Sequence, residues 1–219
     1  MESNRAARSL AALLCCWAIS SAQAQGLDAG GLTFKDFGKS DNGASFSRTD
    51  PISSGAPSQA SSRLLSVNNS ERTARVRFDS IKVEITLPLG WQANEDWERG
   101  VAYSSDRNYR LIVWRVDFAF EGVKDAEHYA STKTGAIKSR RPQVETQARK
   151  LPDGTFVIAY ERVPPGQGDR GQRAVFDLVL SKPGNPKEGV LLTLGVPASE
   201  ADRGLKLLAL VKEKVQIDW

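Results

Sequence analysis

The stretch VEITLPLGWQ, residues 83–92, decides how the fold is interpreted, because a strand pattern stops abruptly inside it. Its apolar residues alternate up to Leu87, as they do when one face of a strand is buried. Pro88 has no backbone N–H for a neighbouring strand and Gly90 permits a tight turn, so the strand is predicted to end there. Trp91 follows at once. Tryptophan at a strand end usually buries its ring, and we expect it to fill the core rather than to stack on a ligand.

Further strand patterns lie on both sides of this stretch. We expect strands near residues 73–78, 101–104, 109–118, 143–150, 155–163, 173–181 and 189–196. YRLIVWRVDF, residues 109–118, is apolar on both faces and predicts a central strand that is covered on both sides. LPDG, residues 151–154, predicts a hairpin turn.

Two helices are expected among these strands. The first covers residues 125–140, with Asp125 as its cap and Pro142 as its stop. The second covers residues 196–215, where apolar residues recur at helical spacing and Ser199 and Asp202 resemble a capping box. The pattern predicts an α+β fold, with an antiparallel β-sheet flanked by helices in a single domain over residues 63–219.

This order of elements resembles the PsbP-like superfamily. A strand ending in LPLGW, a hairpin, a helix, a four-strand meander and a closing amphipathic helix give the resemblance, which covers about residues 74–216. The superfamily includes an extrinsic photosystem II subunit, a Ran-binding nuclear import factor and exported bacterial proteins of the DcrB type, which match best. The resemblance implies an α/β/α sandwich that acts as a binding or assembly module, with no shared catalytic motif and no cofactor.

The first 24 residues read as a secretory signal peptide. Basic residues precede an apolar run, and the small residues before Ala24 suit cleavage after that position. The run is too short for a spanning helix, which needs about 20 apolar residues. A lipid anchor would need a small residue before Cys15 or Cys16, whereas Leu14 and Cys15 precede them. We therefore expect a three-part export signal, a periplasmic or secreted protein, and a mature chain without cysteine or disulfide.

Residues 25–62 are predicted to form a flexible low-complexity tether. Of these 38 residues, 20 are Gly, Ala, Ser or Pro, a composition that buries too little apolar surface to offset the entropy of ordering. LTFKDF, residues 32–37, is the exception. Its aromatic residues either belong to a loosely attached tail, which we expect, or fold back on the domain or dock on a partner.

Composition and motifs exclude several classes of function. The chain carries 30 basic and 26 acidic residues, interspersed, which does not suggest a nucleic-acid binder. The single histidine, His128, cannot form a zinc site alone, and no phosphate-binding or nucleophile-elbow motif is present. If the loop at 164–172 closes symmetrically, Glu161 and Asp177 become neighbours and could perform acid–base chemistry. Packing of the helix 125–140 on that sheet face is the favoured alternative.

The binding residues predicted from the sequence lie in loops. They are Trp97, Arg107, Arg140, Arg141 and Arg170. The arginine clusters suit an anionic partner, although the helix dipole alone explains cations near residue 140. Trp97 lies among charged residues, as interface anchors do, or else packs on the sheet edge.

Three functions follow from these observations. The first is an exported, non-enzymatic module that binds an unidentified protein partner in the periplasm or envelope through loops and a sheet edge. The second is a small-molecule or lipid-binding protein with a groove beside Ala159 and Gly195. The third is a hydrolase that uses Glu161 and Asp177.

Overall fold

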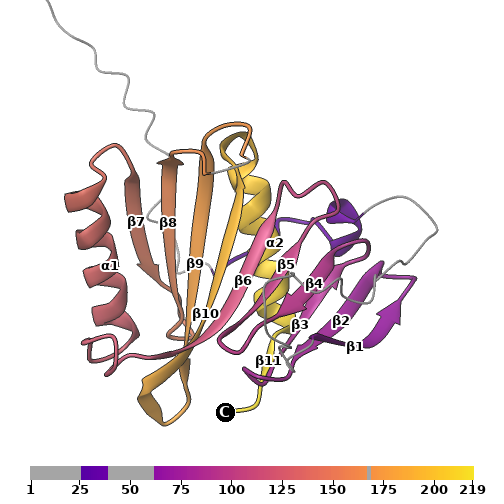
Figure 1. Ribbon diagram of the computed structural model, residues 1–219, viewed down its shortest axis with the longest axis horizontal. Coiled ribbons are helices and arrows are strands. Elements are labelled where there is room, and N and C mark those ends of the chain that lie inside the picture. The colour runs from indigo at the N-terminus through magenta and orange to yellow at the C-terminus, as the bar shows by residue number, and fades with distance from the viewer. Residues whose placement is uncertain (1–25, 39–61, 167–168) are drawn as a thin grey trace, which may run out of the picture.

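Eleven strands form two antiparallel sheets in the part of the chain that the computed structural model describes, residues 26–38, 62–166 and 169–219 (Figure 1). The smaller sheet has the order β1 (Ser62–Asn68), β2 (Thr73–Phe78), β3 (Val83–Pro88) and β11 (Gln216–Ile217). The larger sheet has the order β4 (Gln92–Glu95), β5 (Arg99–Tyr103), β6 (Arg110–Asp117), β10 (Asn185–Pro197), β9 (Arg173–Lys182), β8 (Phe156–Val163) and β7 (Glu145–Lys150). The helices are α1 (Ala126–Arg140) and α2 (Ala201–Lys214), and two 3-10 turns are η1 (Phe34–Phe37) and η2 (Ala198–Glu200).

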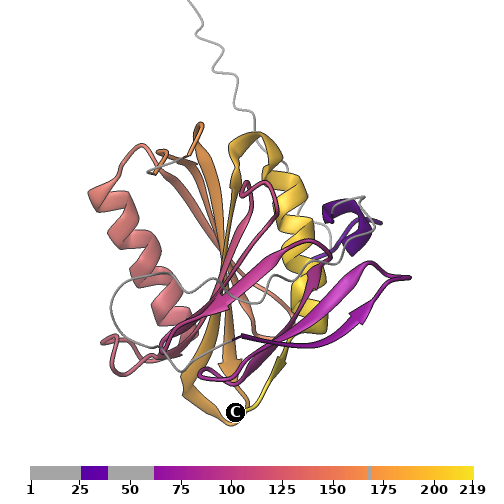
Figure 2. The same cartoon turned by 45° about the vertical axis from the view of Figure 1, so that its right-hand side comes forward.

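The two helices cover opposite faces of the larger sheet (Figure 2). Tyr129 of α1 belongs to one apolar cluster with Ile158 of β8. Leu208 of α2 belongs to a second cluster with the adjacent Val157, and successive residues of a strand point to opposite faces. The smaller sheet shares the second cluster. The predicted α+β class and helix-flanked antiparallel sheet are therefore confirmed, with the strands divided between two sheets.

The stretch at residues 83–92 forms the predicted strand and stop. β3 ends at Pro88, and Gly90 has a φ of 86°, a conformation that glycine adopts without strain. Trp91 is only 1% exposed, and its indole Nε1 donates a hydrogen bond to the carbonyl oxygen of Phe37 at 3.2 Å. Its interpretation as a core residue is confirmed.

The segment at residues 32–37 is part of this core. Phe34 is 6% exposed, and the rings of Phe37 and Tyr109 meet edge to face at 6.3 Å between their centres. The expectation of a loosely attached tail is wrong for these residues, because they fold back on the domain. The remaining tether residues 39–61 and the predicted signal peptide lie outside the described residues.

The two helices begin in different ways. Asp125 caps α1 as expected, since its carboxylate accepts a hydrogen bond from the backbone N–H of His128 at 2.8 Å. The capping box of Ser199 and Asp202 is wrong. Residues 198–200 form a 3-10 turn instead, and α2 begins after Glu200 without a side-chain cap.

A β-bulge sets the register of β8 against β9. Tyr160 pairs with Val175 but Val163 pairs with Arg173, so β8 holds one extra residue between these pairs. Arg162, inside the bulge, has a φ of 56°. The extra residue shifts the pairing by one, and this moves every side chain of β8 to the other face relative to β9.

Candidate functional site

One end of the larger sheet, the upper end in Figure 1, gathers arginines from separate segments. β6 begins at Arg110, which pairs with Gly195 near the end of β10. β9 begins at Arg173, which pairs with Pro197 of the same strand. We call this the arginine end. Antiparallel pairing alone accounts for it, since it places the starts of β6 and β9 beside the finish of β10.

Four of the five predicted binding residues lie at the arginine end, namely Arg107, Arg140, Arg141 and Arg170. Arg107 lies in the β5–β6 turn, with its guanidinium carbon 5.7 Å from the ring centre of Tyr103. Arg170 lines a hollow beside Asn108, whose carbonyl oxygen accepts a 2.8 Å hydrogen bond from Arg173. All four predicted side chains are exposed, and no ion pair joins them to another described residue.

Trp97, the fifth predicted residue, lies elsewhere. It occupies the turn between β4 and β5, whereas the arginine end lies beyond the other end of β5. Its side chain is 64% exposed and so does not pack on the sheet edge. The predicted set therefore separates into two surfaces.

A groove of about 300 Å³ lies between α1 and the adjoining face of the larger sheet. Ile112 and Trp114 of β6 line one side, and Ile137 of α1 lines the other. Arg110 and Arg141 line it where it reaches the arginine end. We call this the α1 groove. Its sides are mainly apolar, with Lys133 of α1 as a charged exception, and its arginine end is cationic.

The floor of the α1 groove holds a buried carboxyl group. Asp177 is 3% exposed and accepts hydrogen bonds from the Tyr160 hydroxyl at 2.8 Å and the Thr193 hydroxyl at 2.6 Å. Burial raises its pKa above the ordinary 3.8, although both hydroxyls and the nearby Lys133 oppose that shift. Because its oxygens are hydrogen-bonded and shielded from solvent, Asp177 is placed to support the floor rather than to exchange protons with a substrate.

The predicted pair of Glu161 and Asp177 is wrong. Glu161 is exposed and lines a separate cavity of about 110 Å³ with Ala159, beside the start of α2, on the other side of the sheet. The bulge in β8 separates the two carboxyl groups. A single groove beside Ala159 and Gly195 is excluded as well. Ala159 pairs with Phe176 and Gly195 pairs with Val175, and these two successive residues of β9 point to opposite faces of the sheet.

A second exposed surface runs along β1. Leu64, Leu65 and Val67 are 43%, 37% and 39% exposed, and we call these three residues the β1 edge. Leu64 pairs with Val76, which is only 2% exposed. The apolar face that is buried at β2 therefore extends to β1, where its side chains are exposed. Among the described strands β1 pairs only with β2 and is the outermost strand of the smaller sheet (Figure 1).

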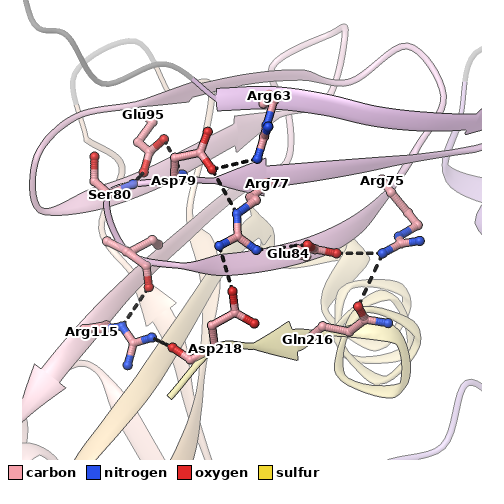
Figure 3. A network of polar contacts seen from close by, with 11 residues as sticks. Arg63, Arg75, Arg77, Asp79, Ser80, Glu84, Glu95, Arg115, Gln216 and Asp218 are labelled. Atoms are coloured by element: carbon pink, nitrogen blue, oxygen red, sulfur yellow. Dashed lines mark hydrogen bonds and ion pairs between the residues drawn. The ribbon is translucent and has the colours of Figure 1, made fainter.

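A polar network connects Arg63 of β1, through Asp79, to Glu95 at the end of β4 (Figure 3). Arg63 of β1 donates to the Asp79 carboxylate at 3.1 Å. The Glu95 carboxylate, two residues before Trp97, accepts the backbone N–H groups of Asp79 at 2.8 Å and Ser80 at 2.6 Å. Burial raises the pKa of Glu95, against the effect of these N–H donors. The network holds the β2–β3 turn, and with it β1, against the turn that carries Trp97.

The same network fixes the C-terminal segment (Figure 3). Arg77 of β2 forms ion pairs with Asp218 at 2.7 Å and with Glu84 at 3.0 Å. Arg115 of β6 donates to the carbonyl oxygens of Ile81 and Asp218. These contacts join the smaller sheet, to which β1 belongs, to β6 of the larger sheet.

Within residues 26–38, 62–166 and 169–219, no group of three or more His, Cys, Asp or Glu side chains is arranged to hold a metal ion. No helix in this part of the chain is both long and apolar enough to cross a membrane.

Comparisons with known proteins find similarity in fold. No protein-family model and no curated protein sequence matches the chain. A solved structure of a mutant of protein Mog1 aligns with a TM-score of 0.48 and 13% identity, over 66% of this chain and 95% of that one. The Ran-binding protein Mog1p of Saccharomyces cerevisiae aligns with a TM-score of 0.47 and 14% identity, over 69% and 96%. Cyanobacterial PsbP from Synechocystis aligns with a TM-score of 0.43 and 16% identity, over 76% and 98%.

These structures resemble the present chain in fold alone, and the resemblance is weak to moderate. At this level of similarity they say nothing of what the present chain binds. Its function has to be argued from its own surfaces.

Proposed function

We propose that this protein is an exported, non-enzymatic module that binds a protein partner in the periplasm or cell envelope through its β1 edge. The observation that supports the proposal is the apolar edge of β1, which pairs only with β2 among the described strands. Natural sheets usually protect an edge with charges, proline or a covering segment, because an open edge pairs readily with another chain. Leu64, Leu65 and Val67 instead present apolar side chains at this edge.

Strand addition is the binding mode that fits this edge. A partner strand would pair with the main chain of β1 and bury the apolar side chains beside it, which gives affinity and specificity together. Trp97, exposed and connected to β1 through the Glu95 network, is placed to act as an anchor at the rim. Tryptophan is among the residues that contribute most to protein interfaces.

Export is the first part of the proposal to test. In the organism that makes the protein, we expect the chain to be processed after Ala24 and to fractionate with the periplasm or envelope. Intact mass spectrometry of the purified protein checks the first residue, and cell fractionation checks the compartment. A full-length chain in the cytoplasmic fraction would contradict export and leave the β1 edge to be tested separately.

The partner is tested by site-specific photo-crosslinking in intact cells. We expect a crosslinker at Leu65 or Trp97 to capture one and the same protein, because both positions lie on the proposed interface. Val67→Lys should weaken capture about tenfold or more, since a charge would replace an apolar contact at the interface.

Phe120 provides the matched control. It is 89% exposed and lies beyond β6, away from the β1 edge. A crosslinker there should not capture the same protein, and Phe120→Lys should leave capture from Leu65 unchanged. Equal capture from all three positions, or no effect of Val67→Lys, would show that β1 is not the interface.

A further inference from the structure

We propose that the α1 groove binds a single-chain anionic amphiphile, with its acyl chain between α1 and β6 and its acidic head group on Arg110 and Arg141. The proposal is independent of the β1 partner. It rests on the shape, the lining and the charge of the groove.

The shape suits one chain. Its volume of about 300 Å³ is at the small end of the range of about 300–1,000 Å³ for pockets that hold small ligands. The two sides come from different elements, α1 and β6, with β9 and β10 of the sheet between them. A two-chain lipid would exceed this space, so the structure favours one acyl chain.

The lining suits an apolar chain along most of the groove. Ile112, Trp114 and Ile137 present aliphatic and aromatic surface from opposite sides. The polar groups of the floor are already satisfied, because Asp177 accepts from both Tyr160 and Thr193. An acyl chain lying over this floor leaves no buried donor or acceptor of that network unpaired, which is the usual cost of apolar burial beside polar groups.

The charge assigns the direction of the ligand. Arg110 and Arg141 come from different elements, line the same groove and form no ion pair with another described residue. Arg107, Arg140 and Arg170 add positive charge at the same end of the sheet. A carboxylate or phosphate is the natural partner of an arginine pair, because guanidinium groups bind both through paired hydrogen bonds. The acidic head is therefore placed at the arginine end and the chain runs inward.

Trp114 allows a direct test with the mature protein. Bromine quenches tryptophan fluorescence only on close contact, and Trp114 lines the groove. We expect 11-bromoundecanoic acid, used below its micelle concentration, to quench the wild type and to lose that quenching in Trp114→Phe. Trp97→Phe is the matched control and should keep it, because Trp97 is exposed in the β4–β5 turn.

A second pair of variants tests the head group. Arg110→Glu with Arg141→Glu should weaken binding about tenfold or more, in keeping with charge-assisted hydrogen bonds. Lys124→Glu with Lys187→Glu makes the same change in net charge away from the groove and should leave affinity unchanged. The methyl ester of the same brominated acid carries no charge. It should therefore bind the wild type as weakly as the acid binds the double arginine variant.

The source of the chain is distinguished by two single-chain arms, the free brominated fatty acid and a brominated lysophosphatidylglycerol presented in vesicles. Quenching of Trp114 by either arm supports the proposal and names the source. Quenching that persists in Trp114→Phe, or no quenching by either probe at saturating concentration, would overturn it. Circular dichroism of each variant checks that the fold is intact.

Discussion

Replacing Trp91 by alanine is expected to lower the free energy of unfolding by about 3–5 kcal/mol, the usual cost of removing a buried aromatic side chain. The residue is 1% exposed, and its ring lies 6.2 Å from that of Tyr109, measured between centres. The loss also removes the donor that holds the carbonyl of Phe37. Urea unfolding of residues 25–219 measures the effect.

Two further variants show which contact matters. Trp97→Ala should change stability by no more than about 0.5 kcal/mol, as surface substitutions usually do, because that ring is 64% exposed. Trp91→Phe keeps much of the volume but loses the hydrogen bond to Phe37, so it should lie between the two and loosen residues 34–37 toward protease. Equal losses for Trp91→Ala and Trp97→Ala would contradict the assignment of Trp91 to the core.

The parts of the fold that were predicted from the sequence depend on local signals. Gly90 and Gly154 mark turns because they adopt positive φ, at 86° and 85°. Asp125 begins α1 because its short carboxylate reaches a free backbone N–H. Such signals are contained in a few consecutive residues, so they can be found without knowledge of the tertiary structure.

The register of the meander could not be predicted in this way. Symmetric closure of the 164–172 loop places Glu161 and Asp177 on one face, and one extra residue in β8 places them on opposite faces. Arg162, at the bulge, has a positive φ, but arginine is not one of the residue types that usually adopt that conformation. One extra residue in β8 therefore determines whether Glu161 and Asp177 lie on the same face of the sheet.

The two candidate surfaces show the same limit. The arginine loops were visible in the sequence, but only the pairing of β6 in the sheet and the packing of α1 on that sheet bring Arg110 and Arg141 to one groove. β1 was missed because it follows a Ser-rich segment. Its signal was the cluster of Leu64, Leu65 and Val67, which is apolar within an otherwise polar region. Contacts between distant segments therefore define the α1 groove, whereas a local cluster of apolar residues marks β1.

Asp177→Asn is expected to flatten the dependence of stability on pH. Burial raises the pKa of Asp177, so the folded protein keeps this proton to a higher pH than the unfolded chain does. The stability that this group contributes is full below its ordinary pKa of 3.8 and is lost as pH rises through the folded value. Asparagine does not ionise and can bond both hydroxyls, so the variant should gain stability over the wild type as pH rises. Urea unfolding from about pH 4 to pH 8 measures this difference.

Two controls separate ionisation from hydrogen bonding. Asp177→Ala leaves the hydroxyls of Tyr160 and Thr193 without their acceptor, and each unpaired buried group costs about 1–3 kcal/mol. The loss of stability in Asp177→Ala should already be present at about pH 4. At that pH the carboxyl of Asp177 begins to ionise in the unfolded wild type but not in the folded protein. Glu95→Gln should remove a slope of the same sign, because burial raises the pKa of Glu95 as well. If the wild type instead became more stable than Asp177→Asn as pH rises, Lys133 would be stabilising an ionised Asp177. The floor of the α1 groove would then hold an ion pair.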